Sequence, residues 1–127
     1  MYNDETTQMN DKAYTFINLG YMDMMSDGDN DMKKIMLEML LEEIPIELQK
    51  MRDQIGPANW TEMASISHKM KSTLAFVGND TMTNANKEIE HISKDQVDTD
   101  NIPALIDTLD NTYANVVTEL KKALEAL

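Results

Sequence analysis

The stretch Ser-His-Lys-Met-Lys-Ser-Thr-Leu-Ala-Phe-Val-Gly, residues 67–78, carries the pattern that decides the fold. Within it and just before it, apolar side chains recur every three or four positions, at Met63, Ile66, Met70, Leu74 and Val77. This spacing predicts an amphipathic helix with one face turned to a core. At about 100° per residue, His68 lies about 160° from the centre of the apolar stripe, so its imidazole is expected to face solvent.

The expected surroundings of this imidazole are small and partly positively charged. The small residues predicted on its face are Thr61, Ala64, Ser65, Ser72 and Ala75. Lys69 and Lys71 lie close to it along the chain. A solvent-facing imidazole in such a clearing suits chemistry in which another macromolecule must reach the ring. Single surface histidines are often inert, so the pattern alone leaves both interpretations open.

The composition favours one all-α domain. The chain has 127 residues, enough for a single buried core. Its four glycines and three prolines are too few for an all-β chain with many tight turns. Its twelve methionines are strong helix formers and adaptable core fillers, which fits a helical fold.

Charge and cysteine content exclude several classes of function. The formal charge of −12 opposes non-specific binding to nucleic acid or to an anionic membrane, because like charges repel. The absence of cysteine excludes disulfides and thiolate metal ligands. No apolar run approaches the roughly 20 residues needed to cross a bilayer, and the polar residues 1–5 do not resemble a signal peptide. A soluble cytoplasmic protein is therefore expected.

Helix signals along the chain predict an antiparallel four-helix bundle with a short additional N-terminal helix. Residues 1–12 are expected to form a loose tail, and residues 13–127 the bundle domain. The expected helices cover residues 14–25, 32–55, 60–77, 80–93 and 102 to the end of the chain. Asn59 and Asn101 are the predicted N-caps of the third and last of these, and Gly78 is predicted to terminate the third.

The helix predicted at residues 32–55 contains Pro45, which removes one backbone hydrogen bond. A kink near Leu41 or a complete break is expected there. The buried face of this helix is expected to contain Ile35, Met36, Met39, Leu40, Ile46 and Met51.

His68 and the residues after it resemble the signature of histidine-containing phosphotransfer (HPt) domains. Lys71 follows the histidine by three positions, the small Ser72 comes next, and Gly78 lies ten positions beyond the histidine. An acidic turn before the second helix, Pro45 within that helix, and the aromatic Trp60 eight residues before the histidine extend the resemblance. It covers about residues 14–125, the predicted helices included.

The resemblance implies a phosphorelay intermediate of two-component signal transduction. Nε2 of His68 would accept a phosphoryl group from the aspartyl phosphate of a receiver domain and pass it to another receiver aspartate. Lys71 would contact phosphoryl oxygens and Lys69 would add a diffuse positive field, as phosphoryl transfer requires positioning and charge neutralisation. The implied partners are response-regulator receivers and a hybrid sensor histidine kinase. The chain is expected to be a monomer without cofactor or autonomous kinase activity, the Mg²⁺ belonging to the receiver.

Two positions depart from the family pattern. Ser72 stands where most relatives have glycine, and its small side chain is expected to keep the imidazole accessible. Glu90 stands 22 residues after His68, where many relatives have glutamine to bond the ring. A carboxylate at this position could accept from Nδ1–H and fix the tautomer that leaves Nε2 free, but it would also favour imidazolium. The alternative for Glu90 is a solvated glutamate.

Three other motifs in the sequence favour plainer interpretations. His91 is followed by Lys94 with the same spacing, but it lies at a helix end without a face of small residues. Glu88 and His91 form one Glu-x-x-His motif, whereas a di-iron bundle needs two. Acidic residues at 27, 29, 31 and 38 fit part of a calcium-loop template, but its required glycine is replaced by Met32, so a helix-capping turn is favoured.

Two alternative functions remain on the sequence alone. The phosphoacceptor domain of a sensor kinase is also helical, but it usually has proline soon after its histidine and an ATP-binding domain downstream; here Thr73 and Leu74 follow and the chain ends at Leu127. Incubation with ATP alone would distinguish it. A helical protein-interaction adaptor, with an incidental His68, would carry no acid-labile, base-stable phosphate.

Overall fold

The computed structural model describes residues 14–127, and this part of the chain contains helices and turns but no strand. The elements are α2 (Gly20–Met25), α3 (Asn30–Ile55), α4 (Trp60–Val77), α5 (Asp80–Asp95), the 3₁₀ turn η1 (Thr99–Asn101) and α6 (Ile102–Glu125). The predicted all-α fold is confirmed. The tail predicted at residues 1–12 lies outside the described residues.

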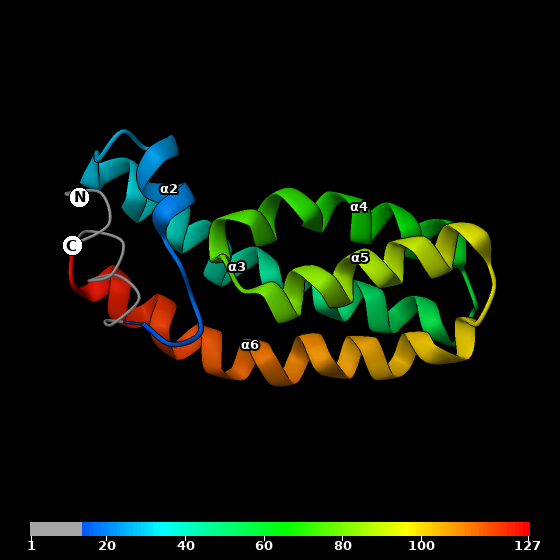
Figure 1. Cartoon of the computed structure of the whole chain (residues 1–127). Helices are drawn as coiled ribbons and strands as arrows, with labels where there is room; N and C mark the ends of the chain where they lie inside the picture. Colours follow the sequence, from blue (N-terminus) through cyan, green and yellow to red (C-terminus); the bar gives the residue numbers. More distant parts are fainter. Residues whose placement is uncertain (1–13) are drawn as a thin grey trace.

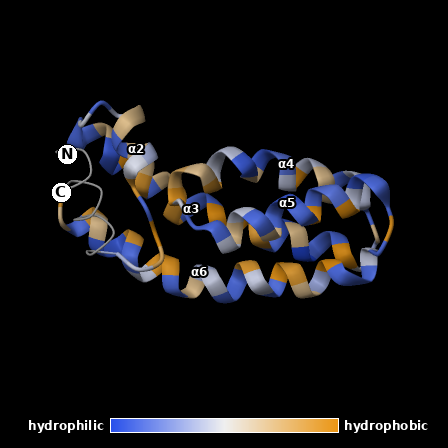
Figure 2. Cartoon of the chain, in the orientation of Figure 1, coloured by the Kyte–Doolittle hydropathy of each residue, from blue (hydrophilic) through white to orange (hydrophobic). Residues whose placement is uncertain are grey.

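The four long helices pack around one apolar core. α3 lies against α4 and α6, α5 also lies against α4 and α6, and successive helices run in opposite directions (Figure 1). Apolar positions recur along each of these helices (Figure 2). Side chains from all four meet in the core, including Leu40, Met70, Ile89 and Leu109. The short α2 lies at one end of the bundle, in contact with α4 and α3.

Side-chain caps begin three of the long helices. Oδ1 of Asp29 accepts from the backbone N–H groups of Asp31 and Met32, and Oδ1 of Asn79 accepts from that of Met82. Oδ1 of Asn59 accepts from the N–H of Glu62, so the predicted cap of α4 is confirmed. These bonds satisfy backbone donors that the first helical turn leaves without partners.

The prediction of a helix over residues 14–25 is wrong in its first half. α2 begins only at Gly20, because the backbone of the preceding segment bonds to other parts of the protein. The carboxylate of Glu119 on α6 accepts from the N–H groups of residues 15, 16 and 17 at 2.6–3.1 Å. The N–H of Asn18 donates to the carbonyl of Val77 at 2.9 Å. This segment therefore joins the ends of α4 and α6.

The predicted buried face of α3 is partly wrong. Its buried residues are Leu37, Leu40, Ile44, Leu48 and Met51, spaced by three or four positions. Ile35 and Ile46 are 60% and 48% exposed. Each lies two positions from a core residue, which is about 200° around the helix. α3 continues through Pro45, so a complete break at the proline is also wrong.

Two helix boundaries differ from the prediction. α5 extends to Asp95, two residues beyond the expected end. Asn101 is the N-cap position of α6, as predicted, but its side chain makes no capping hydrogen bond, because η1 leads directly into the helix. No helix within residues 14–127 is both long and apolar enough to span a bilayer.

Candidate functional site

His68 lies near the middle of α4 and points away from the core. Its side chain is 66% exposed, as the sequence predicts. The small residues Thr61, Ser65, Ser72 and Ala75 on its face are exposed too. Ala64 is buried, so its predicted place in the clearing is wrong; it lies about 40° from His68 on the side of α5. The ring is therefore open to a large partner.

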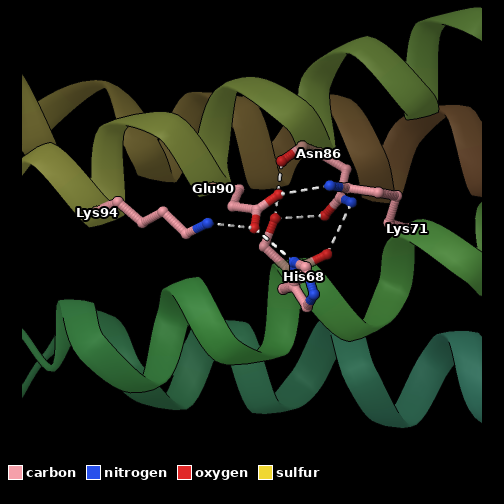
Figure 3. A network of polar contacts seen from close by, with 6 residues as sticks. His68, Lys71, Asn86, Glu90 and Lys94 are labelled. Carbon is pink, nitrogen blue, oxygen red and sulfur yellow. Dashed lines mark hydrogen bonds and ion pairs between the residues drawn. The ribbon is translucent and has the colours of Figure 1, made fainter.

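Glu90 on α5 forms a hydrogen bond with Nδ1 of this imidazole ring. Its side chain is only 8% exposed, and Oε2 lies 2.8 Å from Nδ1 of His68 (Figure 3). Because an ionised carboxylate can only accept, Nδ1 must carry the proton in this hydrogen bond. In a neutral ring the lone pair is then on Nε2, the nitrogen that faces solvent. The alternative of a solvated glutamate is wrong.

Two lysines share the same carboxylate. Nζ of Lys94 lies 3.0 Å from Oε2 of Glu90, and Nζ of Lys71 lies 3.3 Å from Oε1. Both lysine side chains are about 60% exposed, so their ammonium groups border the solvent-facing site. The pKa of Glu90 is lowered to about 2, chiefly by Lys94; burial opposes this shift, and His68 and Lys71 add to it. Glu90 is thus a fixed anion at neutral pH.

A second polar bridge joins α4 to α5 beside this network. The hydroxyl of Ser67 lies 2.7 Å from the backbone oxygen of Asn86 and 2.8 Å from its Oδ1. Nδ2 of Asn86 donates to the backbone oxygen of Ser67 at 3.0 Å. Both residues are buried. Ser67 precedes His68, and Asn86 lies one helical turn before Glu90, so the bridge fixes the level at which histidine and carboxylate face each other (Figure 3).

Lys69 and Lys71 lie on opposite sides of the histidine. Lys69 lines a groove of about 340 Å³ between α3 and α4, whose other lining residues are Glu42, Glu43, Ile46, Glu47, Met70 and Thr73. Lys71 lines a hollow of about 270 Å³ between α4 and α5, together with Leu74, Thr83, Asn86 and Lys87. Lys71 therefore belongs to the Glu90 network, whereas Lys69 faces the acidic side of α3.

The structure brings together three of the five residues singled out in the sequence: His68, Lys71 and Glu90. Ser72 shares the exposed face of the histidine, and Lys69 lies to one side. His91 is 77% exposed and pairs with Asp95 at 3.3 Å, apart from this network.

Ser67, Asn86 and Lys94 contribute to this site without having been predicted to do so from the sequence. Lys94 follows Glu90 by four residues, the spacing of a favourable ion pair on a helix, so a signal for it was present. Asn86 adjoins the apolar positions Met82, Ala85 and Ile89 of the helix expected at residues 80–93, and a polar residue beside such positions is a weaker signal.

The acidic turn before α3 acts as a helix cap. Asp29 accepts the two hydrogen bonds described above, as expected of the capping interpretation. Within residues 14–127, His, Asp and Glu side chains form no group of three or more that could hold a metal ion.

Comparison with known protein families gives one result. A family model described as Hpt domain matches residues 35–127, which include α4, α5 and α6 and nearly all of α3. Comparisons with curated proteins and with solved structures gave no match.

Proposed function

The chain belongs to the Hpt domain family, the phosphotransfer domains of two-component signalling, and from this premise we propose that it is a relay intermediate between receiver domains. His68 takes a phosphoryl group from the aspartyl phosphate of one receiver and passes it to the aspartate of another. The observation that carries the proposal is the exposed imidazole whose Nδ1 is held by the buried Glu90.

The hydrogen bond to Glu90 suits both directions of transfer. Nε2 of neutral His68 attacks phosphorus, a P–N bond forms, and the P–O bond to the receiver aspartate breaks, releasing its carboxylate. The ring becomes cationic while Nδ1 keeps its proton. The fixed negative charge of Glu90 stabilises this developing positive charge, an interaction stronger in the transition state than in the neutral ring. In the second transfer the P–N bond breaks, a P–O bond forms to the aspartate of the other receiver, and the ring returns to its neutral form.

Lys71 is the proposed charge partner of the phosphoryl group. Its ammonium group lies on the same network as the ring, and its side chain is 59% exposed and long enough to reorient. Charge-assisted hydrogen bonds to phosphoryl oxygens would stabilise the transferring group. Lys69, on the side of α3, adds positive field without a contact to Glu90. Ser72 keeps the approach to the ring free.

The proposed docking face for the receiver extends from α4 over α3 and α2. Ile46 is 48% exposed and lines the groove that Lys69 also lines. Toward the C-terminal end of α4, the rings of Tyr21 on α2 and Phe76 on α4 lie 5.2 Å apart. Partly exposed apolar side chains beside a reactive residue are typical of a protein interface. Receivers and a hybrid sensor kinase are the proposed partners, with the Mg²⁺ on the receiver.

Phosphoryl transfer from a labelled receiver tests this proposal. Wild-type protein should take up label that is acid-labile and base-stable, and His68→Gln should take up none. His91→Gln is the matched control, because it removes the other histidine of the chain and should leave labelling unchanged. The proposal fails if the wild type accepts no label, or if His68→Gln is labelled equally well. Labelling by ATP alone would instead indicate kinase activity.

A further inference from the structure

Lys94 occupies a position that the phosphoryl-transfer mechanism above does not use. Its ammonium group shares a single carboxylate oxygen, Oε2 of Glu90, with Nδ1 of His68, at 3.0 Å and 2.8 Å. Two positively polarised donors on one oxygen divide its electron density between them. Lys94 thus acts on the imidazole through Glu90 rather than by touching it.

A cation beside Glu90 is useful to the histidine because Glu90 has two opposed effects on the ring. Its hydrogen bond fixes the useful tautomer, but its negative charge also favours imidazolium, which has no lone pair on Nε2. Charged groups beside the site come from three helices. They are Glu42, Glu43 and Glu47 on α3, the last paired with Lys50; Lys69 and Lys71 on α4; and Lys87, Glu90 and Lys94 on α5. Acidic groups on α3 add to the pull of Glu90, so cations next to that carboxylate matter.

Lys71 and Lys94 are not equivalent in this respect. Lys71 is the group proposed to turn toward the phosphoryl oxygens, and it lies on Oε1, the oxygen that the imidazole does not use. Lys94 lies one turn beyond Glu90 on the same helix and contacts the oxygen that the imidazole does use. When Lys71 moves to the phosphoryl group, Lys94 remains beside the carboxylate.

On the basis of the proposed phosphoryl transfer, we propose that Lys94 is a positioning residue. By contacting the same carboxylate oxygen as the imidazole, it offsets part of the charge of Glu90, so that the carboxylate orients the ring of His68 while Nε2 stays available for attack. The carboxylate supplies orientation, and the lysine limits its preference for imidazolium. This combination lets a glutamate act at a position where many members of the family have an uncharged glutamine.

The test compares Lys94→Gln with the charge-conserving Lys94→Arg. Lys122→Gln is the matched control, because it removes the same charge from an exposed position on α6, which packs against α3 and α5. NMR titration of the His68 ring follows its protonation without any partner. Transfer from a phosphorylated receiver, measured between pH 6 and 8.5 as a ratio to wild type, follows its reactivity.

In Lys94→Gln, the midpoint of the His68 titration should rise by about 0.5 pH unit, the size expected for loss of one adjacent, solvent-exposed charge. The transfer ratio should then fall about threefold at the acidic end of the range and approach one at the alkaline end, because a 0.5-unit shift is about a threefold change in the neutral fraction. In Lys94→Arg, both the titration midpoint and the transfer ratio should match those of wild type. Lys122→Gln should change neither quantity.

The inference is overturned if the titration midpoint of His68 in Lys94→Gln equals that in wild type, or if Lys122→Gln shifts this midpoint by the same amount. It is also overturned if Lys94→Gln lowers the transfer ratio equally at every pH, because a structural defect would have that effect. The failure of the proposed function looks different, because wild-type protein would then accept no phosphoryl group while the titration shift could still be measured.

Discussion

Nδ1 of His68 on α4 and Oε2 of Glu90 on α5 lie 2.8 Å apart. This hydrogen bond joins a side chain that is 66% exposed to one that is only 8% exposed. The pair spans two helices, so its geometry depends on how α4 and α5 pack. The Ser67–Asn86 bridge one residue away on α4 holds that packing. Orientation of the imidazole is therefore a property of the helix pair.

Replacing Glu90 separates orientation from charge. Glu90→Gln keeps an oxygen that can accept from Nδ1–H, whereas Glu90→Ala removes the acceptor. Phosphoryl acceptance by His68 at pH 7 should fall by less than about tenfold in Glu90→Gln and by more than about tenfold in Glu90→Ala, because loss of orientation costs more than loss of charge. Initial rates of transfer from a phosphorylated receiver give the comparison. Equal losses in the two variants would contradict it.

The same carboxylate should contribute to the acid sensitivity of the fold. The pKa of Glu90 is lowered to about 2 in the folded protein, chiefly by Lys94, from its ordinary value of 4.5. A lowered folded-state pKa stabilises the protein fully above the unfolded value, and this contribution is lost as the pH falls from about 4.5 to about 2. Between pH 7 and pH 3 the free energy of unfolding should therefore decrease more for wild type than for Glu90→Gln, as measured by urea titration. Parallel decreases would refute the assignment.

Two buried serines provide a matched test of the α4–α5 bridge. Ser67 is fully buried and bonded to Asn86, whereas the hydroxyl of Ser93, 1% exposed, has no hydrogen-bond partner among residues 14–127. Ser67→Ala should lower the free energy of unfolding by about 1–3 kcal/mol, because it leaves buried groups of Asn86 without their donor. Ser93→Ala should leave it unchanged or slightly raised. Chemical denaturation of both variants measures the difference, and equal destabilisation would contradict the hydrogen-bond assignment.

The helices were predictable because their apolar spacing and caps are local signals. Both ends of α4 were predicted correctly from its apolar stripe at residues 63–77, its cap Asn59 and the terminating Gly78. The exposure of His68 followed from the same periodicity. The buried face of α3 was not predictable in this way. Ile35 and Ile46 are as apolar as the residues that line the core, and only packing against α4 and α6 decides which isoleucine is buried.

The candidate site was partly predictable for a similar reason. His68 and Lys71 lie within one helical turn, so their proximity is local. Glu90 was placed through a family pattern, but its burial and its contacts with His68 and Lys71 depend on the pairing of α4 with α5. The Glu119 contacts that keep residues 15–17 out of α2 join positions more than 100 residues apart, and no local signal indicates them.

The docking face can be tested at its exposed isoleucine. Ile46→Gln should weaken binding of the receiver and slow phosphoryl transfer by about fivefold to tenfold at limiting receiver concentration, because it replaces apolar area in the proposed interface. Val97→Gln is the control, since Val97 is 60% exposed and follows α5 at the far end of the bundle from α2. Equal effects of the two substitutions would place the interface elsewhere.

Gly78 ends α4 where the helix meets the segment before α2. Substitution of this glycine should show how much the junction contributes to the free energy of unfolding. Its φ of 69° lies in the left-handed region, and a Cβ at this position would collide with the backbone oxygen of Asn18. Asn18 cannot easily retreat, because its N–H bonds to the carbonyl of Val77 at 2.9 Å. Gly78→Ala should therefore lower the free energy of unfolding by about 2 kcal/mol or more.

Gly56 supplies the control for this substitution. It follows α3 with a φ of −57°, and an added Cβ would meet no atom of the described part of the chain within 4 Å. Gly56→Ala should raise the free energy of unfolding by about 0.4–1 kcal/mol, because alanine restricts the unfolded chain without strain in the folded one. Urea denaturation of the two variants should move the midpoint in opposite directions. If the midpoint moved in the same direction in both variants, the close approach of Asn18 to Gly78 would not be what makes Gly78→Ala destabilising.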